Sequence, residues 1–130
     1  MSAELPPEAV KLLTDTNLGY LATQNRDGTA QVTPVWVHVE DGRAVFNTAI
    51  GRLKDRNMRR DPRITLSIAD QHDNERYVMI TGTAELIEEG AAEHIEELSQ
   101  KYKGYAFRGW GPGMKRVKVY LNADRVRVDA

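Results

Sequence analysis

The chain has 130 residues, with 18 lysines and arginines, 19 acidic residues, a formal charge of −1 and a pI near 6.3. The length predicts a single domain over residues 1–130, and the balanced charge argues against a nucleic-acid-binding protein. No apolar run approaches the roughly 20 residues that span a bilayer, the N-terminus carries acids where a signal peptide needs bases, and cysteine is absent. These features predict a cytoplasmic protein without membrane contact, disulfides or thiolate metal sites.

The N-terminal half predicts one helix and three strands. The helix begins near Leu5, because prolines and an acid suit a first turn, and Asn17 can end it. Tight turns at 25–28 and 41–42 then separate strands expected over residues 18–24, 30–40 and 43–49. Pro34 lies inside the second of these strands, which predicts a bulge or an edge position there.

The C-terminal half predicts further strands around a second long helix. Strands are expected over residues 63–69, 75–88, 115–121 and 125–128, with a polar loop over 70–74 and a helix over 89–103. Gly82 predicts a bend in the long strand, and Gly104 ends the helix. Six or seven strands, mostly joined by tight turns, predict a mainly β fold, a β-barrel with helices.

Positive charge is concentrated between Arg52 and Arg63, where six basic residues face two acids, so the stretch carries +4 and the rest of the chain −5. A glycine and a short helix follow the strand over 43–49, and Asp61-Pro62 stops that helix. Free N–H groups at a helix start, with Arg52 and Lys54 beside them, form a phosphate cradle. The alternative is a solvated helix whose arginines pair with surface carboxylates.

Other candidate sites are less specific. His38, His72 and His94 share no metal-ligand spacing, so no metal site is expected, and no serine lies in an elbow motif. The aromatic, glycine-rich segment 105–114 is either a core or interface plug or a lid over a flat ligand. No catalytic residue is identified from the sequence.

Four segments in combination are more specific than any one of them. They are Gln31–Trp36 (QVTPVW), Val45–Ala49 (VFNTA), Arg52–Arg63 (RLKDRNMRRDPR) and Tyr77–Glu85 with its Gly-Thr-Ala-Glu end. Together they resemble the flavin/deazaflavin oxidoreductase superfamily, which has the split β-barrel of pyridoxamine-phosphate oxidase. The run from Arg56 to Arg63 is most similar to the branch that uses the deazaflavin coenzyme F-420. The resemblance covers roughly residues 6–128.

The resemblance implies which residues bind the cofactor. The basic block receives the phosphate and acidic tail, two strand segments flank the ring, and a partner chain closes a site shared across a homodimer. The implied cofactor-binding residues are Arg52, Lys54, Asn57 and Arg60 in the block; Gln31, Val32, Thr33, Pro34, Asn47, Thr48 and Ala49 on the strands; and Tyr77, Trp110 and Arg116 as candidates for the second wall.

The expected function is that of an F-420-dependent oxidoreductase that transfers a hydride between the reduced coenzyme and an electron-poor small organic substrate. The cofactor supplies this chemistry, so the lack of an evident catalytic side chain is no objection. The alternatives are an FMN-dependent oxidoreductase or oxidase on the same fold, or a non-catalytic protein that binds F-420 or haem. FMN has one phosphate and no glutamate tail, so the additional arginines favour F-420.

Overall fold

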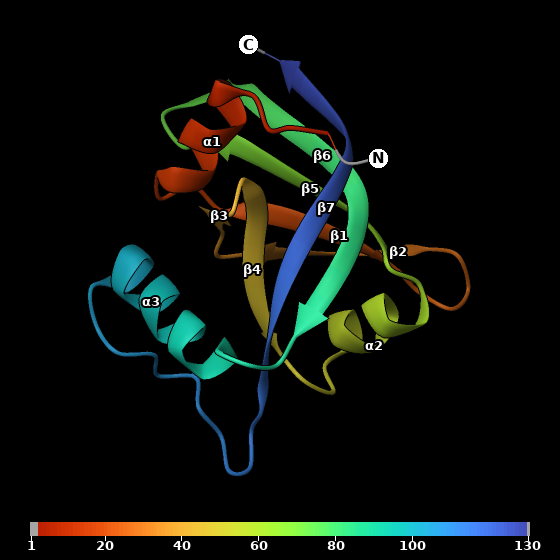
Figure 1. The fold of residues 1–130 in the computed structure, drawn as a ribbon, viewed down its shortest axis with the longest axis vertical. Helices are drawn as coiled ribbons and strands as arrows, with labels where there is room; N and C mark the ends of the chain where they lie inside the picture. The colour runs from red at the N-terminus through yellow and green to blue at the C-terminus, as the bar shows by residue number, and fades with distance from the viewer. Residues whose placement is uncertain (1–2, 130) are drawn as a thin grey trace.

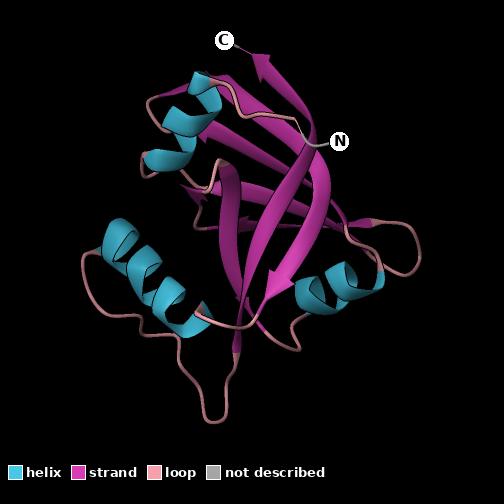
Figure 2. Ribbon diagram, viewed as in Figure 1, coloured by secondary structure: helices cyan, strands magenta, loops and turns pink. Residues whose placement is uncertain are grey.

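The computed structural model describes residues 3–129, and within that range it contains three helices and seven strands (Figures 1 and 2). Figure 1 shows α2 and α3 at one end of the sheet, with α1 and both termini at the other end. The elements are α1 (Pro7–Thr14), β1 (Gly19–Gln24), β2 (Ala30–Val35), β3 (His38–Glu40), β4 (Arg43–Ala49), α2 (Leu53–Arg60), β5 (Arg63–Asp70), β6 (Asp73–Ile87), α3 (Ala91–Lys103) and β7 (Arg116–Asp129).

The strands form one antiparallel sheet in the order β2-β1-β5-β6-β7-β4-β3. The sheet curls strongly but is not closed by hydrogen bonds between its two edges, β2 and β3 (Figure 1). This is the predicted mainly β, split-barrel architecture, which the structure confirms. Its inner face packs around a core of large apolar side chains, among them Leu21, Phe46, Leu66, Ile80 and Leu121. No helix within residues 3–129 is long and apolar enough to cross a membrane.

Gly82 is the point at which the sheet bends, as the sequence predicts. The pairing of β6 with β7 shifts register between Thr81 and Gly82, which leaves Asp124 as an additional residue on β7. A Cβ at Gly82 would lie 2.0 Å from the backbone oxygen of Asn122, so only glycine allows the two backbones to approach this closely. The two C-terminal strands expected from the sequence are one continuous strand, β7, that passes through this bulge.

The prediction of a single strand over residues 30–40 is wrong, because two separate strands lie in this range. The chain leaves β2 after Val35 and resumes as β3 at the opposite edge of the sheet. Side chains of α3 bind the backbone between the two halves: the Val37 N–H donates to Tyr102 Oη at 3.0 Å, and Lys101 Nζ donates to the Val37 oxygen at 2.7 Å. Pro34 lies in β2, an edge strand, so the edge alternative predicted for it is confirmed.

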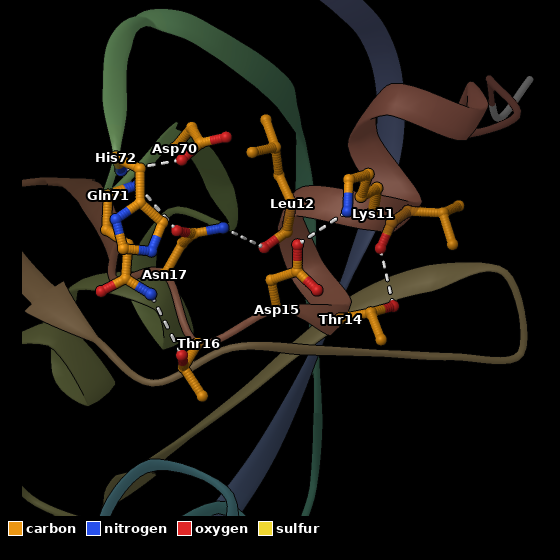
Figure 3. Close-up of polar contacts among 10 residues, drawn as sticks. Lys11, Leu12, Thr14, Asp15, Thr16, Asn17, Asp70, Gln71 and His72 are labelled. Atoms are coloured by element: carbon orange, nitrogen blue, oxygen red, sulfur yellow. Dashed lines mark hydrogen bonds and ion pairs between the residues drawn. The ribbon is translucent and has the colours of Figure 1, made fainter.

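The expected polar loop over residues 70–74 is a tight turn at residues 71–72, because β5 extends to Asp70 and β6 begins at Asp73. The buried Asn17 explains the difference, because its amide joins the turn to the end of α1 (Figure 3). Asn17 Nδ2 donates to the Leu12 oxygen at 3.0 Å, and the Gln71 N–H donates to Asn17 Oδ1 at 2.9 Å. Gln71 Nε2 also donates to Thr16 Oγ1 at 3.2 Å.

Candidate functional site

A pocket of about 530 Å³ lies where β4 and β7 meet the start of α2, the side of α3 and the segment after α3. The strands place backbone and short side chains at its base, and the two helices contribute charged and apolar groups to its sides. Its lining residues are Leu18, Pro34, Val35, Trp36, Asn47, Thr48, Arg52, Lys54, Ile95, Leu98, Lys103, Phe107, Gly109 and Arg116.

Four cations line this pocket, which we call the cationic pocket: Arg52, Lys54, Lys103 and Arg116. None of the described residues that line it is acidic. Burial and the neighbouring charges of Arg52 and Arg116 lower the pKa of Lys54, and burial with the charge of Arg52 lowers the pKa of Arg116 to about 10. The protein therefore holds like charges together, an arrangement that an anionic ligand would relieve.

The start of α2 leaves Arg52 and Lys54 free for such a ligand. Gly51 adopts a positive φ of 97°, and its N–H donates to Asp55 Oδ2 at 2.8 Å. The other oxygen of this buried carboxylate, Oδ1, accepts from Arg59 Nε at 2.8 Å. Both carboxylate oxygens of Asp55 therefore bind groups in or next to α2. Neither Arg52 nor Lys54 forms a salt bridge within residues 3–129.

The side-chain amide of Asn47 orients the Arg116 guanidinium, and Arg116 forms no salt bridge with a carboxylate among the described residues. Its Nε–H donates to Asn47 Oδ1 at 2.8 Å, and its guanidinium carbon lies 5.0 Å from the centre of the Phe107 ring. Asn47 Nδ2 in turn donates to the Ala91 oxygen at 3.0 Å and lies 3.0 Å from His94 Nδ1. The positive charge of Arg116 is oriented by these contacts without being neutralised.

Thr48 lines the cationic pocket, but its hydroxyl is buried away from solvent. Its side chain is 2 % exposed, and its Oγ1 has no hydrogen-bond partner among the described residues. A buried hydroxyl without a partner costs roughly 1–3 kcal/mol, so such groups are uncommon unless water or a ligand satisfies them. Thr48 lies next to Asn47 on β4, and because its Oγ1 is not solvent-accessible, its other atoms form its part of the surface of the cationic pocket.

Aromatic rings form the remaining wall. Trp36 stacks on Tyr102 with ring centres 5.5 Å apart and an angle of 10°, and Phe107 meets Trp36 edge-on at 6.3 Å. Glu96 holds the segment that carries Phe107, because its carboxylate accepts from the Phe107 N–H at 2.9 Å and from Trp110 Nε1 at 2.8 Å. The cationic pocket thus combines an anion-binding end with flat apolar surfaces.

The structure brings together part of the cofactor-binding set that the sequence predicts. Pro34, Asn47, Thr48, Arg52, Lys54 and Arg116 line the cationic pocket. Asn57 and Arg60 face a different pocket of about 510 Å³, which also includes Arg26 and Arg56. Asn57 Nδ2 donates to Thr23 Oγ1 at 3.1 Å and to Asn25 Oδ1 at 2.9 Å, so this side chain joins α2 to the end of β1. The basic block is divided between two pockets.

The other predicted residues lie outside the cationic pocket of their own chain. Val32 is 60 % exposed on β2, and Trp110 lies against Phe107 on the segment that Glu96 holds. Tyr77 lies near the start of β6, where its hydroxyl donates to Asp129 Oδ2 at 3.1 Å. The residues in this group are Gln31, Val32, Thr33, Ala49, Tyr77 and Trp110.

Sequence reasoning missed several residues of the cationic pocket. Trp36 ends the Gln31–Trp36 segment quoted above, so that segment carried a signal for it. Phe107 belongs to the aromatic segment for which a ligand lid was one interpretation. Lys103 gave no signal, because a lysine in the last turn of a helix is accounted for by the helix dipole. Within residues 3–129 no group of three or more histidine and acidic side chains is arranged to hold a metal ion.

Comparison with known proteins gives one family. The sequence profile described as pyridoxamine 5'-phosphate oxidase matches residues 5–128. A structure called an F-420 reductase aligns with a TM-score of 0.83 and 24% identity, over 95% of this chain and 98% of that one. A conserved hypothetical protein of Mycobacterium tuberculosis aligns with a TM-score of 0.77 and 29% identity, over 98% and 86%. A Lactobacillus delbrueckii protein provisionally assigned as a pyridoxamine 5'-phosphate oxidase aligns with a TM-score of 0.70 and 24% identity, over 95% of this chain and 93% of that one.

Proposed function

Because the chain belongs to the pyridoxamine 5'-phosphate oxidase family, whose members bind flavin- or deazaflavin-type cofactors, we propose that it is an F-420-dependent oxidoreductase. Its reaction is the transfer of a hydride between the reduced coenzyme and an electron-poor small organic substrate. The cationic pocket is the cofactor site in this proposal. The observation that carries it is the group of four cations in a pocket that has no acid among its described lining residues.

The number of cations favours F-420 over FMN. F-420 carries a phosphodiester and a γ-linked glutamate tail, whereas FMN carries one terminal phosphate. Arg52 and Lys54 at the start of α2, with Arg116 across the pocket, offer more positive charge than one phosphate requires. The second pocket, lined by three arginines (Arg26, Arg56 and Arg60) and one acid (Asp27), extends the positive charge along α2 and suits the acidic tail. The F-420 reductase of similar fold is consistent with this choice.

The residues of the cationic pocket fit a cofactor of this kind, which supplies the hydride chemistry when bound. Arg52 and Lys54 would bind the phosphate. Trp36 and Phe107 offer apolar surface to a flat ring and exclude water from it. The contribution of the protein is therefore binding, orientation and exclusion of solvent, without a protein nucleophile.

An exposed apolar face supports a homodimer with shared sites. Strand pairing places Pro34, Tyr20, Ser67, Met79 and Arg127 in one row across β2, β1, β5, β6 and β7. Tyr20 is 49 % exposed and Met79 36 %, so the row presents apolar surface to solvent. Pro34 belongs both to this row and to the cationic pocket, so a second copy on the face would also border the pocket.

The proposal is tested by turnover. Reduced F-420 is mixed with the purified protein and a panel of electron-poor acceptors, such as quinones and enones, and oxidation is followed by the absorbance of the deazaflavin. Turnover that Lys54→Met reduces supports the proposal. Turnover with reduced FMN alone would identify the FMN-dependent alternative. Tight binding of F-420 without turnover of any acceptor would identify a cofactor-binding protein, and a haem spectrum would identify the haem-binding one.

A further inference from the structure

His94 is a buried histidine that the cofactor site does not itself contain. It lies on α3, is 4 % exposed, and its Nε2 has no hydrogen-bond partner among the described residues. It lines a separate cavity of about 200 Å³ together with His38, Glu40, Glu97 and Lys101. Its other ring nitrogen, Nδ1, faces Asn47 on β4. This histidine therefore lies between a small cavity and the residue that holds Arg116.

The hydrogen bonds around Asn47 fix the proton position on His94. Asn47 Oδ1 accepts from Arg116 Nε, and Asn47 Nδ2 donates to the Ala91 oxygen. The amide nitrogen is thus the group that faces His94 Nδ1, at 3.0 Å. Nδ1 must then be an acceptor, and the proton of the neutral ring is on Nε2.

We propose that His94 is a positioning residue for the cationic pocket, acting through Asn47 on Arg116. The neutral ring accepts from Asn47 Nδ2, which keeps Asn47 Oδ1 directed at Arg116 Nε. Arg116 then presents its charge to the pocket without a carboxylate partner. The inference rests on the proposed function of the pocket, and it adds a residue from α3 that does not line it.

Protonation of His94 would break this chain of contacts. Both ring nitrogens would then be donors, and Nδ1–H would face the Asn47 amide hydrogens. Rotation of the amide would direct Oδ1 at His94, but it would also direct Nδ2 at the Arg116 N–H and Oδ1 away from its donor. Burial, and then the charge of Lys118, hold the pKa of His94 low, at about 4, so the ring is neutral at physiological pH.

Charged groups from every neighbouring element act on this ring. Lys118 and Arg116 on β7 and His38 on β3 disfavour a further positive charge, whereas Glu40 on β3 favours it. Glu40 is partly neutralised, because its Oε1 accepts from Lys118 Nζ at 2.7 Å and from Tyr120 Oη at 2.7 Å. Glu97 and Lys101 of α3 itself also border the cavity. The surroundings therefore favour the neutral form that the positioning role requires.

Two substitutions separate positioning from simple packing. His94→Asn places an amide oxygen near the position of Nδ1, so it keeps an acceptor for Asn47 and does not titrate. His94→Leu keeps apolar bulk and removes the acceptor. The first readout is the Arg116 Nε–H resonance in a ¹H–¹⁵N spectrum, measured without ligand. The second is the affinity for inorganic phosphate, measured at one pH for all three proteins.

The wild type and His94→Asn should both show an exchange-protected Arg116 Nε–H signal, and His94→Leu should lose it. Phosphate binding should weaken about tenfold in His94→Leu, the size of one lost charge-assisted contact, and less than threefold in His94→Asn. Below about pH 5 the wild-type signal should broaden as His94 titrates, while that of His94→Asn persists. If His94→Leu does not fold, this pH comparison between the wild type and His94→Asn tests the positioning role on its own.

An unchanged Arg116 signal in a folded His94→Leu, or the same pH response in the wild type and His94→Asn, would overturn the positioning role. Neither result depends on which cofactor binds. Failure of the proposed function would show itself differently, as absence of F-420 binding by a wild type whose Arg116 signal behaves as described.

Discussion

Lys54→Met is the substitution that best separates ligand binding from folding. Methionine retains the apolar stem of lysine and removes the ammonium group. Lys54 is half-buried beside Arg52 and Arg116, and these neighbours, after burial itself, lower its pKa. Without ligand, removal of its charge relieves repulsion, so the melting temperature should stay constant or rise. With ligand, the same substitution removes a contact to phosphate.

The expected loss of binding follows from the kind of contact. A hydrogen bond to a charged group contributes about 1.5–3 kcal/mol, so the dissociation constant for F-420 should rise about ten- to hundredfold. The loss should be smaller at high salt, because part of the attraction acts at a distance that counterions screen. Fluorescence titration of F-420 at two salt concentrations, with thermal melts of the ligand-free proteins, measures both quantities.

Arg56→Ala is the comparison variant, because Arg56 borders the second pocket, which the proposal assigns to the acidic tail and not to the phosphate. Arg56 lies on the same helix and carries the same charge, but it faces the second pocket and forms no salt bridge within the described residues. Its loss should weaken binding less than Lys54→Met does. Arg59 is unsuitable, because it pairs with the buried Asp55. Unchanged F-420 binding by Lys54→Met, with a melting temperature several degrees lower, would show that the Lys54 charge stabilises the fold and does not contact the ligand.

Three further predictions concern folding and assembly. Gly82→Ala should lower the free energy of unfolding by at least about 2 kcal/mol in urea titrations, because its Cβ would meet the Asn122 backbone at 2.0 Å; a loss below 0.5 kcal/mol would contradict that contact. Val32→Glu, on the exposed apolar face, should convert a dimer to a monomer in sedimentation experiments while the monomer stays folded; an undisturbed dimer would exclude this face. His94 has a pKa of about 4 when folded, against about 6.5 when unfolded, so its contribution to stability is complete above pH 6.5 and is lost as the pH falls through 4. Wild type should lose up to about 3 kcal/mol over this range relative to His94→Asn, and equal losses would refute the assignment.

Local chemistry explains which parts of the fold the sequence predicts well. The capping Gly104 and the prolines of α1 act on their own backbone, so these helix ends could be predicted from them. Gly82 interrupts its strand and predicts a bend, but the approach of the Asn122 backbone that requires a glycine there is visible only in the structure. The break after Val35 could not be predicted, because the groups that bind its backbone come from Lys101 and Tyr102, more than 60 residues away. The alternation of apolar and polar residues along one strand carries no information about side chains of a distant helix that bind its backbone.

The cationic pocket likewise combines residues that local sequence identifies with residues that only the tertiary structure brings together. Arg52 and Lys54 could be recognised because a glycine and a helix start lie beside them in the sequence. The division of the basic block between two pockets could not, because it depends on the position of α2 against β1. Lys103 and Phe107 reach the cationic pocket through the tertiary position of α3 and the segment after it, so their role is visible only in the structure.

We expect the cationic pocket to select a multiply anionic deazaflavin. Dissociation constants for three ligands under one set of conditions measure this selection: F-420, FMN, and the deazaflavin ring system without its phosphate and glutamate tail. F-420 should bind at least about a hundredfold more tightly than the ring system alone, as expected for two charge-assisted contacts, and more tightly than FMN. Equal affinity for F-420 and the bare ring system, or tighter binding of FMN, would show that the charge of the pocket does not select F-420.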